Sequence, residues 1–190
     1  VRGSILYDGY PLTLERAKAF RGKEIALVPQ GVTWLDPMMR VGPQICRGKR
    51  DTASKELCRE TLARYGLGPE VEELYPFQLS GGMARRVLIA AAVMDTPRLV
   101  VADEPTPGLD ARAAARILGH FRELAQEGTG VLFITHDLEL ALTVADKVVV
   151  MYEGQTVDET GAASFRTGEG LTHPYSRALW RAMPGNEFQP

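Results

Sequence analysis

The chain has 190 residues and a mass of 20.8 kDa, which corresponds to one domain or to one domain with a small appendage. Hydrophobic residues make up 45% of the sequence and charged residues 24%, a composition that excludes a mainly disordered protein. The formal net charge of −2 gives no basic field, so we predict no nucleic-acid partner. The two cysteines, Cys46 and Cys58, form neither a CxxC metal pattern nor a disulfide framework, and this suits a reducing compartment.

Short apolar runs alternate with longer amphipathic segments, which is typical of an α/β sheet with crossover helices. Residues 1–9 have the pattern of a strand that enters a turn. Further along, four unbroken runs rich in β-branched residues predict strands buried on both faces, at least three of them parallel. These runs are Ile25–Val28, Leu99–Ala102, Val131–Ile134 and Val148–Met151.

Apolar residues recur at helical spacing within residues 83–94, 117–125 and 138–145, and each set predicts a helix with one buried face. Ser80, Asp110 and Asp137 stand where N-caps belong, because each directly precedes one of these segments. Pro97 and Gly128 stand where the first two helices are expected to end.

We predict a domain over residues 1–161, into which a helical subdomain of about residues 41–96 is inserted. Asp51 is expected to cap a helix of that subdomain. Residues 162–190 form a predicted C-terminal extension with a last short helix near residues 175–183. Two histidines, His120 and His173, are expected to have structural roles.

Two adjacent carboxylates, Asp103 and Glu104, directly follow a predicted buried strand. In open α/β sheets ligands bind at the carboxyl ends of the strands. Adjacent carboxylates repel each other, so a divalent cation is a natural partner for one, and the other remains to orient a water molecule. The alternative is that both acids only cap the turn that follows, at residues 105–108.

The segment Ser80-Gly81-Gly82 opens a predicted helix with a capping serine and two residues without side chains. Free backbone N–H groups at the positive end of a helix dipole favour phosphate oxygens, although a Ser-Gly-Gly start is more often a simple N-cap. His136 follows another predicted strand, and we expect it at the same sheet edge as Glu104.

The motifs in this order resemble those of the ATP-binding cassette (ABC) ATPases. The Q-loop, signature, Walker B, D-loop and H-loop of that family correspond to Val28–Gln30, Leu79–Gly82, Leu99–Thr106, Gly108–Asp110 and Thr135–Asp137. The resemblance covers about residues 4–161 and implies a P-loop NTPase-like, mainly parallel α/β sheet with crossover helices. It also implies ATP and Mg²⁺ as cofactors.

The resemblance implies a role for each residue that matches a motif. Asp103 would hold Mg²⁺ through water, and Glu104 would act as the general base for attack on the γ-phosphate. Gln30 would reach the metal and the attacking water, and His136 would contact the γ-phosphate.

The family acts as a head-to-tail dimer, so the resemblance also implies a second ABC ATPase subunit as partner. Ser80, Gly81 and Gly82 would hold the γ-phosphate of a nucleotide bound mainly by that subunit, and Asp110 would act at the dimer seam.

The sequence departs from the family pattern in one large way, since no GxxxxGK[ST] Walker A motif is present. The family places that loop before the strand that matches residues 5–7, so we interpret its absence as an N-terminal truncation. An adenine-stacking aromatic residue is missing as well, and we expect the 190 residues alone to bind ATP poorly. Two smaller departures are Ala84 and Arg85, where close relatives often have Arg and Gln.

Residues 30–37 and 172–179 look like the peptide and nickel importer branch of the family. The predicted function is therefore that of the ATP-hydrolysing subunit of an importer for oligopeptides, dipeptides or nickel, peripheral to the cytoplasmic face of the inner membrane. Its partners would be transmembrane permease subunits and, indirectly, an extracytoplasmic solute-binding protein. Trp34, Met38 and Met39 are candidate permease contacts, and their alternative role is packing in the core.

Two alternatives to this function remain open. The chain could be a truncated or degenerate cassette subunit that only completes the ATP site of a partner. It could also be a non-transport ABC ATPase, but the long coiled-coil insertions or tandem cassettes expected of such proteins are not present in the sequence.

Overall fold

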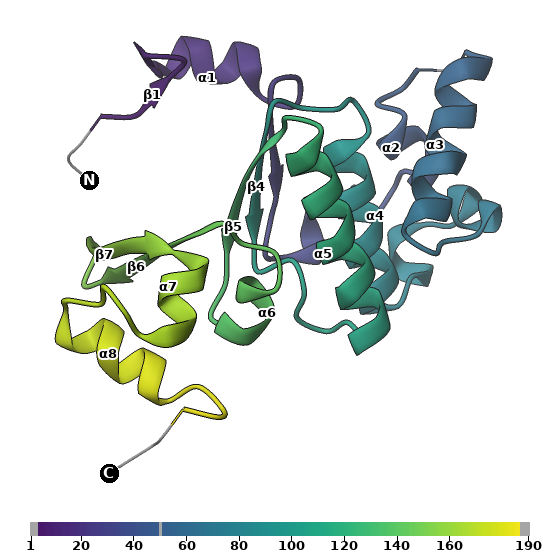
Figure 1. Cartoon of the computed structure of the whole chain (residues 1–190). Helices are drawn as coiled ribbons and strands as arrows, with labels where there is room; N and C mark the ends of the chain where they lie inside the picture. Colours follow the sequence, from purple (N-terminus) through teal and green to yellow (C-terminus); the bar gives the residue numbers. More distant parts are fainter. Residues whose placement is uncertain (1–3, 50, 187–190) are drawn as a thin grey trace. The chain divides into compact units, whose positions relative to one another are not determined.

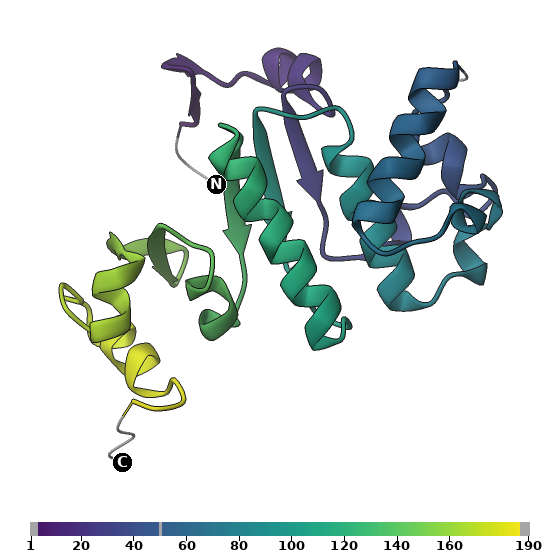
Figure 2. The same cartoon turned by 45° about the vertical axis from the view of Figure 1, so that its right-hand side comes forward.

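The computed structural model describes residues 4–49 and 51–186 (Figures 1 and 2). Its contacts divide the chain between Ile134 and Thr135 into two compact units. The functional domain boundary that the sequence places after residue 161 stays a prediction. Within the described ranges, no helix is both long enough and apolar enough to cross a membrane.

The first unit is built on a three-stranded parallel sheet. Its strands are β3 (Ile25–Val28), β4 (Leu99–Asp103) and β5 (Gly130–Ile134), in the order β3-β4-β5. The register pairs Val28 with Ala102, and Asp103 with Ile134. This confirms three parallel strands and brings their carboxyl ends to one edge of the sheet.

Helices cover one face of this sheet. Figures 1 and 2 show α4 (Gly81–Val93) and α5 (Ala111–Gln126) along the same side, where the strands bury Ala26, Val28, Val100 and Ala102. Both helices start at the predicted caps, Ser80 and Asp110, and end before Pro97 and Gly128 as expected.

The opposite face of the sheet is open in the part of the chain that the structure describes. Leu27 is 53% exposed, Leu132 53% and Ile134 46%. The prediction that these strands are buried on both faces is therefore wrong for β3 and β5. Successive side chains of a strand point to opposite faces, and the described helices of the first unit pack on only one of them.

The helical part of the first unit shares one hydrophobic core with the sheet, since Val41, Ile45 and Leu62 belong to the same buried cluster as Ala26 and Val100. It consists of α2 (Val41–Ile45), α3 (Thr52–Arg64), η2 (Pro69–Glu73) and η3 (Pro76–Gln78). The predicted cap of α3 is confirmed, because Asp51 accepts a hydrogen bond from the backbone N–H of Ser54 at 2.9 Å.

Residues before β3 form a hairpin and a short helix. The strands β1 (Leu6–Tyr7) and β2 (Tyr10–Pro11) flank the turn at Asp8 and Gly9, as the pattern at the start of the chain suggested. The helix α1 (Leu14–Phe20), capped by Thr13, is one that the sequence pattern did not predict.

The second unit has its own small core, which includes Leu142, Val150, Phe165 and Leu171. The predicted strand near residues 148–151 is β6 (Lys147–Tyr152), and it pairs antiparallel with β7 (Gln155–Gly161), which the sequence pattern did not predict. The prediction that this strand is buried on both faces is wrong, since Val149 is 49% exposed and Met151 63%. The remaining elements are α6 (Leu138–Leu142), α7 (Ala162–Thr167) and α8 (Pro174–Arg181). The helix predicted through residue 145 thus ends earlier, and the predicted last helix is confirmed.

A buried polar pair joins α3 to α5. Tyr65, fully buried at the end of α3, shares a hydrogen bond with Nδ1 of His120, which is 4% exposed. His120 also accepts from Arg64, and burial lowers the pKa of its ring, so the imidazole stays neutral. The structural role predicted for this histidine is confirmed.

We predict that Tyr65→Phe lowers the free energy of unfolding by about 1–3 kcal/mol, because it leaves a buried ring nitrogen without its partner. Denaturant unfolding of the purified chain measures the change. Tyr7→Phe is the control, since its half-buried hydroxyl makes a single 3.3 Å bond to Glu24 and its loss is expected to cost about 0.5 kcal/mol or less. Equal losses in the two variants would contradict the prediction.

In the second unit, Asp158 of β7 ties the strand to the segment before α8. Its carboxylate accepts hydrogen bonds from the hydroxyl and N–H of Thr172, at 2.6 and 3.1 Å, and from the N–H of His173 at 2.9 Å. These neighbours hold the pKa of Asp158 well below its usual value. The hydroxyl of Ser176 lowers this pKa most, although it lies outside ordinary hydrogen-bond geometry, and Thr172 lowers it next most.

Because the pKa of Asp158 is lowered by folding, its stabilisation is present above the ordinary carboxyl pKa of 3.8 and is lost as the pH falls below it. We therefore predict that Asp158→Asn is less stable than the wild type at pH 7 and that the difference shrinks at pH 3. Denaturant unfolding followed by tryptophan fluorescence at both pH values tests this. The exposed neighbour Glu159, changed to Gln, is the control, and a difference for Asp158→Asn that does not depend on pH would refute the prediction.

Candidate functional site

Three predicted site residues stand at the carboxyl ends of neighbouring parallel strands. Gln30 is the second residue after β3, Asp103 is the last residue of β4, and Glu104 follows it. The pairing of Val28 with Ala102 sets the two strand ends side by side. The exposed Gln30 and the half-buried carboxylates thus lie at the sheet edge where open α/β proteins bind ligands.

The backbone of Glu104 has a left-handed conformation, with φ of 46°. A glutamate rarely adopts this conformation, which costs about 1–3 kcal/mol and persists only where the surroundings enforce it. Here the Glu104 N–H donates to the carbonyl of Ile134 at 2.9 Å, so pairing with β5 holds the residue in place. The strained backbone directs Glu104 out of the strand at the point where the sequence predicts the catalytic base.

The signature segment forms the start of α4. Ser80 caps this helix by accepting from the N–H of Met83 at 3.2 Å. Gly81 is exposed, and a Cβ added there would meet nothing within 4 Å. The N-terminus of this 13-residue helix is therefore open to a ligand, and its dipole and unpaired N–H groups suit phosphate oxygens.

The start of α4 lies against the predicted D-loop. A Cβ added to Gly82 would lie 3.5 Å from both the Gly108 carbonyl oxygen and Cδ2 of Leu109. Next to them, the exposed Asp110 caps α5 by accepting from the N–H of Ala113 at 2.8 Å. The structure therefore brings the signature and the D-loop together, and it gives Asp110 a structural role whether or not it acts at a dimer seam.

His136 is placed two residues after β5, at the start of the second unit, and its side chain is exposed. Asp137 caps α6 as predicted, by accepting from the N–H of Leu140 at 3.0 Å. The structure thus brings together Gln30, Asp103 and Glu104, and the role of His136 stays a prediction. The other histidine of this unit, His173, is a cap: its ring accepts from the N–H of Tyr175, which confirms the structural role expected for it.

The two carboxylates suit a magnesium ion that is bound by the protein and a nucleotide together. The described residues contain no cluster of three or more His, Cys, Asp or Glu side chains that could enclose a metal. Mg²⁺ usually keeps several waters and is bound through one or two carboxylates together with substrate phosphates. Asp103 and Glu104 therefore suit an ion shared with a nucleotide rather than one held by protein alone.

One residue of the site was missed by the sequence analysis. Arg85 of α4 is 7% exposed, its Nη1 donates to the carbonyl of Pro29 at 2.9 Å, and its charge interacts with Asp103 and Glu104. Burial lowers the pKa of its guanidinium, and the two carboxylates counteract that effect. The sequence contained a signal for Arg85. A helix that is apolar almost all round is buried, and an arginine within such a helix needs polar or charged partners.

Comparisons with known proteins all match this chain to one family. Residues 1–107 match the family model described as "ABC transporter". The chain is 39% identical over 196 residues to the oligopeptide transport ATP-binding protein OppD of Bacillus subtilis, with 96% of this chain and 54% of that protein covered. It is 40% identical over 188 residues to the dipeptide transport ATP-binding protein DppD of Haemophilus influenzae, with 91% and 56% covered.

Solved structures agree on the fold. A structure titled as the ATP binding subunit of an ABC transporter matches with a TM-score of 0.78 at 23% identity and covers 94% of this chain and 75% of that one. A dimeric ATP-binding cassette bound to ADP and Pi matches with a TM-score of 0.75 at 23% identity, covering 85% and 74%. The chain spans about half the length of the curated transport relatives it matches. Because the family model covers more than half of the sequence and five motifs occur in its order, the chain belongs to the ABC transporter family.

Proposed function

We propose that this chain is the ATP-hydrolysing subunit of an ABC importer for peptides. The observation that carries the proposal is the arrangement of Gln30, Asp103 and Glu104 at adjoining strand ends, in the unit whose signature helix α4 opens to solvent at Gly81. The names of the relatives favour an oligopeptide or dipeptide as the solute, and one further relative is a glutathione import protein of Salmonella, 41% identical over 177 residues. None of these names favours nickel.

The proposed chemistry follows from the positions of the side chains. Asp103 would hold Mg²⁺ through water, and Gln30, at the adjoining strand end, would contribute its amide to the ion and to the attacking water. Glu104 accepts a proton from that water as its oxygen attacks the γ-phosphorus in line. The bond from the γ-phosphorus to the β–γ bridging oxygen breaks, so inorganic phosphate forms and ADP leaves. His136 contacts the γ-phosphate in this proposal. The ATP phosphates bring the charge that completes the magnesium site.

The signature acts on a nucleotide held mainly by a second ATPase subunit. Ser80 and the N–H groups at Gly81 and Gly82 bind its γ-phosphate at the positive end of α4. Asp110 lies close to this helix start through its neighbours Gly108 and Leu109, which supports a role for it at the same seam. The sequence contains no GxxxxGK[ST] segment, so hydrolysis has to be measured in the assembled transporter.

We predict that Glu104→Gln, which keeps the shape of the side chain but not the base, lowers ATP hydrolysis by the purified transporter about 10²- to 10⁴-fold. ATP binding is expected to persist, so filter binding of labelled nucleotide accompanies the rate measurement. Glu127→Gln is the control, an exposed carboxylate after α5 that touches no motif.

Wild-type hydrolysis in the Glu104→Gln transporter would show that the working site belongs to the partner. The chain would then only complete that site with its signature, which is the alternative that the sequence leaves open.

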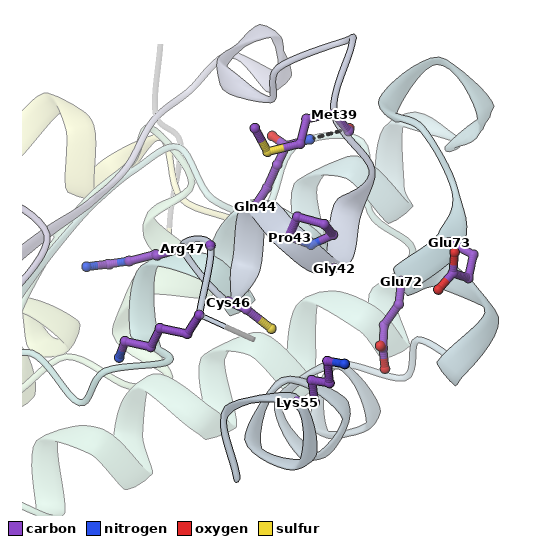
Figure 3. A pocket seen from close by; sticks show the side chains of 11 residues that line it. Met39, Gly42, Pro43, Gln44, Cys46, Arg47, Lys55, Glu72 and Glu73 are labelled. Carbon is purple, nitrogen blue, oxygen red and sulfur yellow. Dashed lines mark hydrogen bonds between the residues drawn. The ribbon is translucent and has the colours of Figure 1, made fainter. Parts of the chain in front are cut away.

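A permease contact is the second part of the proposal. Trp34 is 70% exposed and Met38 85%, in the segment that follows Gln30, so core packing does not explain them. Met39 lines an adjoining pocket of about 890 Å³ between α2, α3 and η2 (Figure 3). Gln44 braces the pocket rim by donating to the carbonyls of Asp36 and Met39, at 3.0 and 2.7 Å. Exposed Trp and Met side chains beside a hollow are typical of a surface that receives a partner helix.

The importer function further places the chain at the cytoplasmic face of the inner membrane, bound to permease subunits, with an extracytoplasmic solute-binding protein as an indirect partner. The link through Trp34 and Met38 is what holds the ATPase to the membrane in this proposal.

We predict that the double variant Trp34→Ala with Met38→Ala binds the permease at least about tenfold more weakly, since two large apolar contacts are lost. Thermal stability is expected to change little because both side chains are exposed. Sedimentation of the chain with permease-containing vesicles measures binding. Met151→Ala, which removes a 63% exposed methionine of β6, is the control, and equal binding by the double variant would refute the contact.

A further inference from the structure

Helix α4 carries an arginine on its buried side. Eight of its residues are buried, and all of these except Arg85 are apolar: Ala84, Val87, Leu88, Ile89, Ala90, Ala92 and Val93. Arginine is almost never buried without partners, and its guanidinium stays charged in proteins. The groups with which Arg85 interacts therefore indicate its role.

The first partner is the backbone before the Gln30 segment. The Pro29 carbonyl accepts from Nη1 of Arg85 at 2.9 Å. Pro29 follows the last residue of β3, so its carbonyl lies beyond the pairing between β3 and β4, which ends at Val28 and Ala102. A side chain of α4, rather than the sheet, therefore fixes the chain at the residue that directly precedes Gln30.

The second set of partners is the carboxylate pair. Asp103 and Glu104 both interact electrostatically with the Arg85 charge; Asp103 is the last residue of β4, the strand that pairs with β3, and Glu104 follows it. The buried Arg85 thus donates to the residue before Gln30, and it lies near enough to the two acids for their charges to counteract the lowering of its guanidinium pKa by burial. Its Nε–H has no hydrogen-bond partner among the described residues, although it is fully buried. A charge and a spare donor in this position can both act on the acids.

The signature starts the same helix. Arg85 lies three residues after Gly82, within the rigid run of α4 that Ser80 caps. Arg85 therefore connects the helix that begins at the signature to the carbonyl of Pro29.

We propose that Arg85 is a positioning residue that locks the Gln30 segment and the Asp103–Glu104 pair in one arrangement and links that arrangement to the signature helix. The proposal rests on the proposed function, since it concerns how the groups of that site are held. It predicts that Arg85 acts on the rate of hydrolysis through the placement of Gln30 and Glu104, without touching the nucleotide.

The test compares Arg85→Met, Arg85→Gln and Arg85→Lys with the matched control Arg86→Met. Arg86 is the next residue of the same helix, but it donates to the carbonyls of Tyr65 and Gly66 at 3.1 Å instead of to Pro29. Hydrogen exchange of the assembled transporter, followed by mass spectrometry, is measured over residues 30–35 and 65–68. ATPase kinetics of the same preparations give kcat and KM separately.

For Arg85→Met we expect about ten- to hundredfold faster exchange over residues 30–35, the effect of losing one charge-assisted hydrogen bond from a local opening equilibrium. We expect kcat to fall about tenfold or more with little change in KM, because the nucleotide contacts remain. Lysine is expected to restore most of both properties, since it keeps the charge and a donor, and glutamine is expected to restore less. Arg86→Met is expected to raise exchange over residues 65–68 instead.

Unchanged exchange over residues 30–35 in Arg85→Met would overturn the proposal, as would equal effects of the Arg85 and Arg86 variants on both segments. If Arg85→Met does not fold, the comparison of Lys with Gln decides, because equal exchange and equal kcat in these two would remove the role of the charge. The proposed function fails separately, if the wild-type transporter hydrolyses no ATP or if Glu104→Gln leaves the rate unchanged.

Discussion

The parallel pairing of β3 and β4 is the constraint on which the candidate site depends. Antiparallel strands would place the ends that carry Gln30 and Glu104 at opposite edges of the sheet, whereas the parallel register sets Val28 beside Ala102 and both residues at one edge. Pairing with β5 adds the bond from the Glu104 N–H to Ile134, which fixes a backbone conformation that a glutamate does not adopt by itself. The placement of the candidate site residues follows from these ladders.

Helix α4 connects the two halves of that chemistry. Its N-terminus, capped by Ser80 and open at Gly81, suits a phosphate group, which in the proposed function belongs to a nucleotide held by a second subunit. One turn later its buried arginine holds the Pro29 carbonyl beside the carboxylates of the chain's own site. The same helix thus carries both the signature and the arginine that holds the residue before Gln30.

The main elements of the fold were predictable where the determinants are local. The three parallel strands, the caps at Ser80, Asp51 and Asp110, and the last short helix agree with the prediction, because caps and apolar spacing act within a few residues. The strand β7 was missed because it is polar and packs in a two-stranded hairpin, although the turn at Glu153 and Gly154 before it was a usable signal.

By itself the sequence determined the order of the motifs, the residue types at the strand ends and the starts of the helices, since these are properties of contiguous residues. Only the tertiary structure decided which face of the sheet is covered, that Trp34 and Met38 are exposed, and that Arg85 reaches Pro29 across 56 residues of sequence. The physical reason is that burial and ion pairing depend on segments far apart in the chain, and a local pattern records that a side chain needs a partner but not which one it meets.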